Sequence, residues 1–326
     1  MKNIFISILL ITSVLLLTSC SNDSVKTEEP EKKNDHKPVT FTYSDQDFKI
    51  VPSYYDYLTY IEKTRENPTK LKSIFKQSVL KSLEEEGFTA TDYFIFQPPN
   101  NLDVLEGKAK ALIEGENEIF KAVKESIQES SDMLPGEGKP IIITPTNPSI
   151  PSVTYSMERM NGVLGFSPND GSILLIIDST YEKESLLYTV AHEYHHTVNK
   201  ELNQNGYISS FLIDRILFEA KADAFAEMVY PNIEVPWTKP LTKEEEKKIL
   251  YILNNNYDST NKSLIDEFRN GSPDKGLPIW SNYRIGNKIM HSFLAKNPDV
   301  SIKEWTEMPA KEIIQNSDYK DILRRE

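Results

Sequence analysis

The stretch Ala191-His192-Glu193-Tyr194-His195-His196 reads His-Glu-x-x-His from its second residue. Residues i and i+4 of a helix lie about 40° apart around its axis, so the imidazoles of His192 and His196 can bind one metal ion. Glu193 lies beside them and can accept a proton from a water molecule. His195 points away from this pair and is expected behind the site or at the surface. The motif therefore predicts a metal centre on a helix.

The residues that flank the motif predict the helix that it needs. Apolar side chains recur at helical spacing, as in a helix with one face in a core. They are Leu186, Leu187, Val190, Ala191, Tyr194 and Val198. We expect this helix to extend from about Glu184 to Leu202.

A second predicted helix, from about Ser209 to Val229, carries a candidate third ligand. Catalytic zinc is usually held by three protein ligands, with a fourth position left for water. In the segment Glu219-Ala-Lys-Ala-Asp223, Glu219 can be that ligand. Asp223 lies one turn further on the same face, where it can accept the second ring N–H of a ligand histidine. One Zn²⁺, held by the two outer histidines of the motif and Glu219, is the predicted cofactor.

The remaining pattern indicates an α+β fold, because short strands in the middle of the chain have helices before and after them. Expected strands are 41–51, 141–143, 163–166 and 172–177, with a hairpin turn over 167–171. Further expected helices are 54–88 with a break near Asn67-Pro68, 102–130, 243–254 and 280–295. A turn at Asn205-Gly206 connects the two helices of the predicted metal site. The segment after residue 143, rich in proline, threonine and serine, is expected to be a loop.

Together these residues resemble the gluzincin group of metallopeptidases, whose signature is His-Glu-x-x-His followed by Glu-x-x-x-Asp. More narrowly, they resemble the YjaZ-like predicted zinc-dependent proteases, which share the His-Glu-Tyr-His-His form and a stretch like Leu212-Ile213-Asp214. The resemblance spans about Val163 to His291. It implies a zincin-like fold: a short mixed sheet, an active-site helix and a returning ligand helix, here with a helical N-terminal portion. Family members often have glycine after the third ligand, where this chain has Ala220, which leaves a close backbone approach there in question.

The resemblance also implies groups that handle the substrate. In such peptidases an edge strand before the active-site helix pairs with an extended peptide, and the segment Gly171 to Ile177 fits that place. A plain core strand is the alternative for this segment. A later Tyr or His commonly donates to the oxyanion, which makes Tyr283 in Tyr283-Arg-Ile-Gly286 the candidate and His291 the second choice. Either residue could instead be a packed helix residue.

The N-terminus resembles that of a bacterial lipoprotein. Lys2 precedes an apolar run from Ile4 to Leu17, which is short for a membrane span but fits a signal peptide. The run ends in Leu17-Thr-Ser-Cys20, which is similar to a lipobox. We expect a signal peptide over residues 1–19 and a lipid on Cys20. An ordinary signal peptide or an uncleaved anchor is the alternative.

This interpretation divides the chain into three parts. After the signal peptide, residues 20–40 are expected to be a flexible tether because they are polar and carry almost no aliphatic side chains. Residues 41–326 form the zincin-like domain, with a helical N-terminal portion over 41–138 and a metal-site portion over 139–326. The lipid would anchor the protein to the outer face of the cell membrane.

Composition limits the possible partners. Hydrophobic residues make up 39% of the 326 residues, which is enough for a core, and the formal net charge of −12 argues against a nucleic-acid ligand. Cys20 is the single cysteine, so no disulfide can stabilise the fold. The expected partners are a peptide or protein substrate and the membrane, and the chain is expected to be a monomer.

Zinc-dependent hydrolysis of peptide bonds by a membrane-tethered lipoprotein is the predicted function. The main alternative is a lipoprotein that binds zinc or a peptide on the same scaffold without turnover. The presence of Glu193 favours hydrolysis, because a metal site alone has no need of a general base. In a third interpretation, the histidines are core residues and no metal binds.

Overall fold

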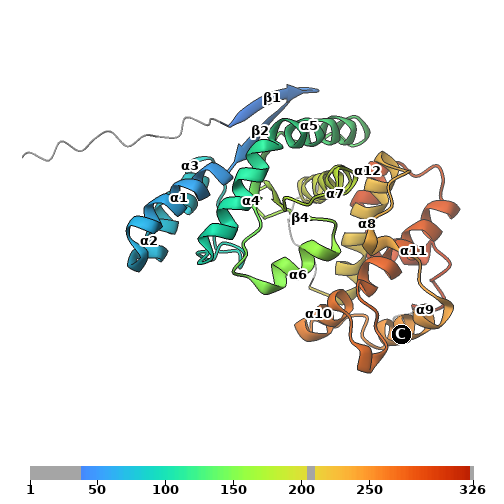
Figure 1. Ribbon diagram of the computed structural model, residues 1–326. Helices are drawn as coiled ribbons and strands as arrows, with labels where there is room; N and C mark the ends of the chain where they lie inside the picture. Colours follow the sequence, from blue (N-terminus) through green and yellow to red (C-terminus); the bar gives the residue numbers. More distant parts are fainter. Residues whose placement is uncertain (1–37, 204–209, 324–326) are drawn as a thin grey trace, which may run out of the picture. The chain divides into compact units, whose positions relative to one another are not determined.

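The computed structural model describes residues 38–203 and 210–323, which belong to one compact unit (Figure 1). The predicted signal peptide, Cys20 and nearly all of the predicted tether lie outside the described residues. So does the predicted turn at Asn205-Gly206.

The centre of the fold is a five-stranded mixed sheet with the order β1-β2-β3-β5-β4. Its strands are β1 (Val39–Tyr43), β2 (Gln46–Pro52), β3 (Pro140–Pro145), β4 (Val163–Phe166) and β5 (Ile173–Ile177). The three central strands β2, β3 and β5 are parallel, and β1 and β4 pair antiparallel at the two edges. The predicted α+β class and the predicted mixed sheet are thus confirmed.

Helices cover both faces of this sheet. Alternate residues of β3 face different cores. Ile141 and Ile143 pack in the same core as helices α5 and α7, whereas Ile142 packs in the core of α1 and its neighbours. A central strand buried on both faces needs apolar residues at every position, which explains its unbroken isoleucine run. Figure 1 shows α1 to α3 on one side of β2 and α5 on the other.

The N-terminal helices confirm one predicted break and add another. The helix α1 (Tyr54–Glu66) ends before Pro68, which starts a 3₁₀ turn. Helices α2 (Leu71–Phe75) and α3 (Lys81–Glu85) follow, joined by one π-helical turn. The predicted helix 102–130 is two helices, α4 (Leu102–Glu114) and α5 (Glu116–Met133), because the chain breaks at Gly115.

The single strand predicted over 41–51 is a hairpin. Strands β1 and β2 pair from Tyr43 and Gln46 outward, and the two loop residues Ser44 and Asp45 have φ of 47° and 62°. Positive φ at both positions is the type I′ pattern, which suits the twist of a two-residue hairpin. Ser-Asp lacks the glycine that usually marks such a turn, so the alternating pattern looked continuous.

The second half of the chain has more helices than predicted. The predicted helices are present as α7 (Lys183–Leu202), α8 (Leu212–Val229), α9 (Lys243–Asn255) and α11 (Ser281–Lys296). The segment predicted as a loop contains α6 (Pro151–Arg159), with Pro151 at its first turn, where proline is favoured. Also missed were α10 (Lys262–Asn270), α12 (Ile302–Glu307) and α13 (Ala310–Gln315).

Helices α7, α8 and α11 position the site. A Cβ placed on Gly286 of α11 would lie 2.8 Å from Ala220 Cβ and 2.9 Å from the carbonyl oxygen of Ile216, both on α8. The close approach left in question at Ala220 is therefore made possible by a glycine on the facing helix. This contact brings Tyr283, one turn before Gly286, toward the predicted ligands.

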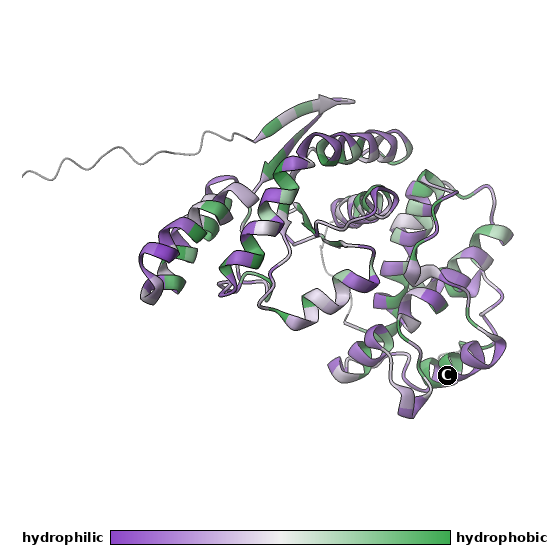
Figure 2. Cartoon of the chain, in the orientation of Figure 1, coloured by the Kyte–Doolittle hydropathy of each residue, from purple (hydrophilic) through white to green (hydrophobic). Residues whose placement is uncertain are grey.

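Most helices are amphipathic, and Figure 2 shows both hydrophilic and hydrophobic residues on them. Their apolar faces lie in the two cores described above. Within the described part of the chain, no helix has the length and apolarity that crossing a bilayer requires.

Candidate metal centre

The structure brings the three predicted ligands together. On α7, Nε2 of His192 lies 3.4 Å from Oε2 of Glu219 on α8, and Nε2 of His196 lies 3.5 Å from the same oxygen. One ligand atom from each residue lies within 4.8 Å of the others. Both imidazoles are buried, whereas the Glu219 side chain is 18% exposed, so the cluster faces an opening.

These spacings fit a zinc ion. An ion bound about 2.0–2.1 Å from each atom of a tetrahedral set holds those atoms roughly 3.4 Å apart. The distances of 3.4 and 3.5 Å from the two histidine nitrogens to Oε2 of Glu219 correspond to edges of such a tetrahedron. Two imidazole nitrogens and one carboxylate oxygen are also a donor set typical of catalytic zinc.

Asp223 occupies the position expected of a residue that orients a ligand. Nδ1 of His192 lies 2.9 Å from Oδ1 of Asp223, which is fully buried. The same oxygen accepts hydrogen bonds from Trp237 Nε1 at 3.1 Å and from the Tyr188 hydroxyl at 3.3 Å. With Nδ1 donating to this carboxylate, Nε2 of His192 is the nitrogen available to a metal.

The charges of the site favour an anionic Glu219. Burial alone would raise the pKa of Glu219, but hydrogen bonding and charge interaction with His192 and His196 outweigh it and hold the pKa well below its usual value. Burial opposes a charge on His192, yet Asp223 and Glu219 outweigh that effect and raise the pKa of the imidazole. The His196 ring stacks on Phe218, with ring centroids 4.1 Å apart, which fixes its orientation.

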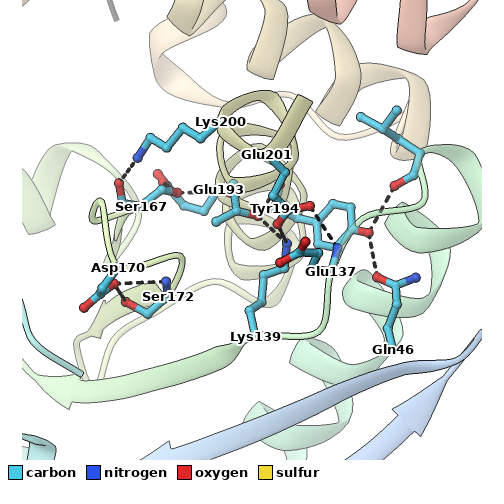
Figure 3. Close-up of polar contacts among 12 residues, drawn as sticks. Gln46, Glu137, Lys139, Ser167, Asp170, Ser172, Glu193, Tyr194, Lys200 and Glu201 are labelled. Carbon is cyan, nitrogen blue, oxygen red and sulfur yellow. Dashed lines mark hydrogen bonds and ion pairs between the residues drawn. The ribbon is translucent and has the colours of Figure 1, made fainter. Parts of the chain in front are cut away.

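Glu193 lies on the cavity side of α7, next to the three ligands, and is held by the loop after β4. Its Oε2 accepts a hydrogen bond of 2.6 Å from the Ser167 hydroxyl, and Lys200 Nζ donates to the carbonyl oxygen of Ser167 (Figure 3). Gly165 makes room for this carboxylate, since a Cβ there would lie 2.4 Å from Cγ of Glu193. The side chain is thereby confined between helix and strand.

The two predicted oxyanion donors differ in position. Tyr283 lines the same cavity as the ligands, and its ring centroid lies 6.4 Å from that of His192. Burial, together with the charge of Glu219, raises the pKa of Tyr283 well above its usual value, so its hydroxyl stays protonated and can donate. His291 is not among the residues that line the cavity, and its Nε2 lies 2.5 Å from Oε2 of Glu227. The geometry therefore favours Tyr283.

His195 is a buried core residue and does not lie at the surface. Its ring stacks on Trp305, with centroids 5.4 Å apart, and its Nε2 lies 3.1 Å from Thr306 Oγ1. Burial holds the pKa of His195 well below its usual value, so the ring is neutral. A position on the back of α7 becomes buried because α12 packs there, which the helical spacing alone could not show.

A cavity of about 640 Å³ opens over the ligands. One wall comes from Tyr93, Phe94, helix α6 and strand β4, and the other comes from helices α10 and α11 and from Trp237. Glu193, the three ligands and Tyr283 all line it. The cavity thus combines a metal site, a carboxylate and a hydroxyl donor with space for a ligand.

The predicted edge strand was assigned to the wrong segment. Strand β5 lies between β3 and β4 and is buried along its whole length, so it is a core strand. The edge strand next to the active-site helix is β4, whose residues Leu164, Gly165 and Phe166 line the cavity. Chain order did not reveal this, because β4 precedes β5 in sequence but lies outside it in the sheet.

Sequence reasoning missed several residues around the site. The Ser167 hydroxyl donates to Glu193, and Lys200 donates to the carbonyl oxygen of Ser167. Trp237 donates to Asp223. Ser167 was interpreted only as part of a turn. No local signal singles them out, because each reaches the site through tertiary packing.

A His-His-Glu cluster on two packed helices, with a further carboxylate beside it, defines a site of the kind in which zinc peptidases hold their ion. The chain belongs to the family described as "Predicted Zn-dependent protease (DUF2268)", which matches residues 119–315 and so more than half of the chain. The match begins in α5, before the segment that carries the motif resemblance.

One curated relative is "Uncharacterized protein YjfC" of Bacillus subtilis (strain 168), which is 24% identical over 168 residues. The alignment covers 48% of this chain and 56% of that protein, so the chain spans about half the length of this relative. No solved structure matches the chain.

Proposed function

We propose that this protein is a gluzincin-type zinc peptidase on a zincin-like scaffold that hydrolyses peptide bonds in the cavity over His192, His196 and Glu219. One observation carries the proposal: Nε2 of each histidine lies at a tetrahedral-edge distance from Oε2 of Glu219, and Glu193 lines the same cavity. A metal site that only binds an ion needs no second carboxylate beside the ligands.

His192, His196 and Glu219 would hold a zinc ion, which would supply a water molecule of lowered pKa and a positive charge to polarise the scissile carbonyl. Glu193 accepts a proton from the attacking water while the water oxygen forms a bond to the carbonyl carbon. Glu193 then passes that proton to the amine as the C–N bond breaks. The Tyr283 hydroxyl donates a hydrogen bond to the oxyanion that forms in between.

Other residues of the chain prepare this reaction. The Ser167 hydroxyl holds Oε2 of Glu193, so the carboxylate needs little reorganisation before it accepts a proton. Strand β4 presents its outer edge to the cavity, where an extended substrate can add as a further strand. Main-chain pairing of this kind tolerates many side chains, so the substrate is proposed to be a peptide segment rather than one small molecule.

The decisive experiment measures metal and cleavage on the same preparation. Purified protein should contain one equivalent of zinc, and it should digest a peptide library in a reaction that a chelator stops and zinc restores. Bound zinc without any cleavage would favour the alternative of a binding protein. Absence of bound zinc after loading would contradict both.

We further propose that a lipid on Cys20 tethers the protein to the outer face of the cell membrane. The sequence Leu17-Thr-Ser-Cys20 after an apolar run supports this. Wild-type protein should incorporate an alkyne-labelled fatty acid and sediment with membranes. Cys20→Ala should lose the label, and unchanged labelling of that variant would contradict the proposal.

A further inference from the structure

The cavity walls carry charged side chains that the proposed mechanism does not use. Apart from the site itself, these are Arg159, Lys200, Asp266 and Arg269. Lys200 donates to the carbonyl oxygens of Ser167 and Pro168, and the Arg159 guanidinium lies 4.3 Å from the ring centroid of Tyr155. Arg269 differs from both, because among the described residues no hydrogen bond or ion pair engages its guanidinium.

Acids are available to pair with arginines in this chain. Acidic residues outnumber basic ones by 49 to 37, and two other arginines do pair with acids: Arg65 with Asp103 at 2.5 Å, and Arg284 with Glu245 at 3.5 Å. Asp266, one turn before Arg269 on the same helix, lines the cavity too but makes no ion pair with it. The guanidinium of Arg269 therefore keeps its donors free inside the cavity.

The backbone of Arg269 is held in place. It lies near the end of α10, directly after the fully buried Phe268. Its carbonyl oxygen accepts a hydrogen bond of 2.8 Å from the backbone N–H of Trp280, just before α11. A fixed backbone with a free, solvent-accessible head group is the arrangement that a substrate-binding arginine needs.

Arg269 also lies within electrostatic reach of the site. Charge interactions with the acidic groups around it, with Tyr283 first and then Glu219, Asp266 and Glu193, outweigh burial and raise the pKa of Arg269. The guanidinium is therefore a permanent cation on the Tyr283 side of the cavity. Its planar fork can bind both oxygens of one carboxylate, which a lysine at this position could not do.

We propose that Arg269 is a specificity-determining residue that binds a carboxylate of the peptide substrate. The inference rests on the proposed function and names its substrate class: peptides with a carboxylate near the scissile bond. That carboxylate can come from the C-terminus of the peptide or from an Asp or Glu side chain. Both sources supply the same group, a planar carboxylate that can accept hydrogen bonds from the free N–H donors of Arg269.

The test compares matched peptides on zinc-loaded, full-length protein. Cleavage sites are first mapped with a peptide library, and each substrate is then made in pairs: free acid against C-terminal amide, and Asp or Glu against Asn or Gln. For the wild type we expect kcat/KM to be roughly tenfold higher for the carboxylate member of one pair type, the size of a charge-assisted hydrogen bond. The pair type that shows the preference identifies the source of the carboxylate.

The variant Arg269→Gln should reduce that ratio to about one, mainly by lowering kcat/KM for the carboxylate member. Arg269→Lys should retain part of the preference, because the charge remains but the fork is lost. Lys262→Gln is the matched control: it removes an exposed cation from the same helix, outside the cavity lining, and should leave the ratio unchanged. A wild type without preference, or an Arg269→Gln variant that keeps it, overturns the proposal.

A binding measurement separates this proposal from the proposed function. Zinc-loaded Glu193→Gln protein is equilibrated by dialysis with a pool of N-acetyl tetrapeptides that contains both members of each pair. Retention of the carboxylate members, lost in a Glu193→Gln, Arg269→Gln double variant, supports the subsite even if the wild type cleaves nothing. Equal retention of both members in the single variant overturns it even if the wild type is an active peptidase.

Discussion

Helix α7 contacts two polar clusters on different sides (Figure 3). In the closed cluster, around Lys139, the charged group is paired within the protein. In the open cluster, around Glu193, part of the bonding capacity is not used by the described residues. On the core side, Lys139 Nζ donates to Thr197 Oγ1 and to Glu201 Oε1, each at 2.7 Å, and lies 4.7 Å from the ring centroid of Tyr194. On the cavity side, Glu193 accepts from the Ser167 hydroxyl through Oε2.

The two clusters differ in whether their hydrogen-bonding groups all have partners in the protein. The ammonium of Lys139 has partners in the protein, as a buried charge that stabilises a fold requires. Among the described residues, Oε1 of Glu193 and the Tyr283 hydroxyl have no hydrogen-bond partner, and both residues line the cavity. Bonding capacity that faces a cavity is available to a ligand, so the open cluster is the functional one. The predictions below test whether the two sides separate stability from activity.

The largest effect is expected for Glu193→Gln. The amide keeps the shape of the side chain but cannot accept the proton, so peptide cleavage should fall by at least about 10³-fold. Zinc content, measured by elemental analysis, and the urea unfolding midpoint should stay close to wild type. Substantial cleavage by this variant with zinc still bound would show that another group is the base.

The opposite pattern is expected for Lys139→Met on the core side. Removing one partner of a buried ion pair costs about 3–5 kcal/mol of stability, and Glu201 is 22% exposed, so we expect a loss at the lower end, about 3 kcal/mol. Urea unfolding measures this loss, and cleavage per folded molecule should not change. Lys49→Met is the control, because the Lys49–Glu86 pair is more exposed, at 36% and 28%, and should contribute less than about 1 kcal/mol. A drop in activity without lost stability would mean that the two sides are coupled.

The closed and open clusters also differ in how far the sequence predicts them. The ligand pair and Glu193 lie within one helical turn, so spacing alone specifies their geometry. Glu219 and Asp223 could be added because they form a second local pattern on the next helix. The distances around Glu219 agree with the predicted pairing of these two helices.

Features that depend on strand order or distant packing were not predictable in this way. Strand β4 becomes the edge because it folds back outside β5, and His195 becomes buried because α12 covers it. Lys139 lies in a loop-to-strand segment whose sequence gives no sign of a buried cation. Each of these depends on contacts between residues far apart in the chain, which one sequence does not encode in any short pattern.

Asp223→Asn tests the residue that orients the ligand His192. The amide retains the size of the side chain but loses the negative charge opposite Nδ1 of His192. Loss of such a partner typically lowers metal affinity about 10- to 100-fold, so zinc should dissociate at lower chelator concentrations. Competition with a zinc-binding dye measures this affinity. Wild-type affinity would mean that the negative charge of Asp223 is not needed to orient His192.

The smallest effect is expected for Ser167→Ala, because it removes one hydrogen bond and no charge. The Ser167 hydroxyl does not touch the ligands, so zinc affinity should be unchanged. Without this donor, Oε2 of Glu193 is less well oriented, and kcat should fall by up to about tenfold, which corresponds to one hydrogen bond of roughly 1 kcal/mol.

Ser172→Ala provides the matched control, because the Ser172 hydroxyl donates to Asp170 in the same loop without contacting Glu193 (Figure 3). Both variants remove a loop hydroxyl, so a general loosening of the loop would lower kcat equally in the two. A decrease confined to Ser167→Ala assigns the effect to the orientation of the base. Ser167 would then belong with the open cluster. Its hydroxyl donates a hydrogen bond to one carboxylate oxygen of Glu193, and the other oxygen stays available to the cavity.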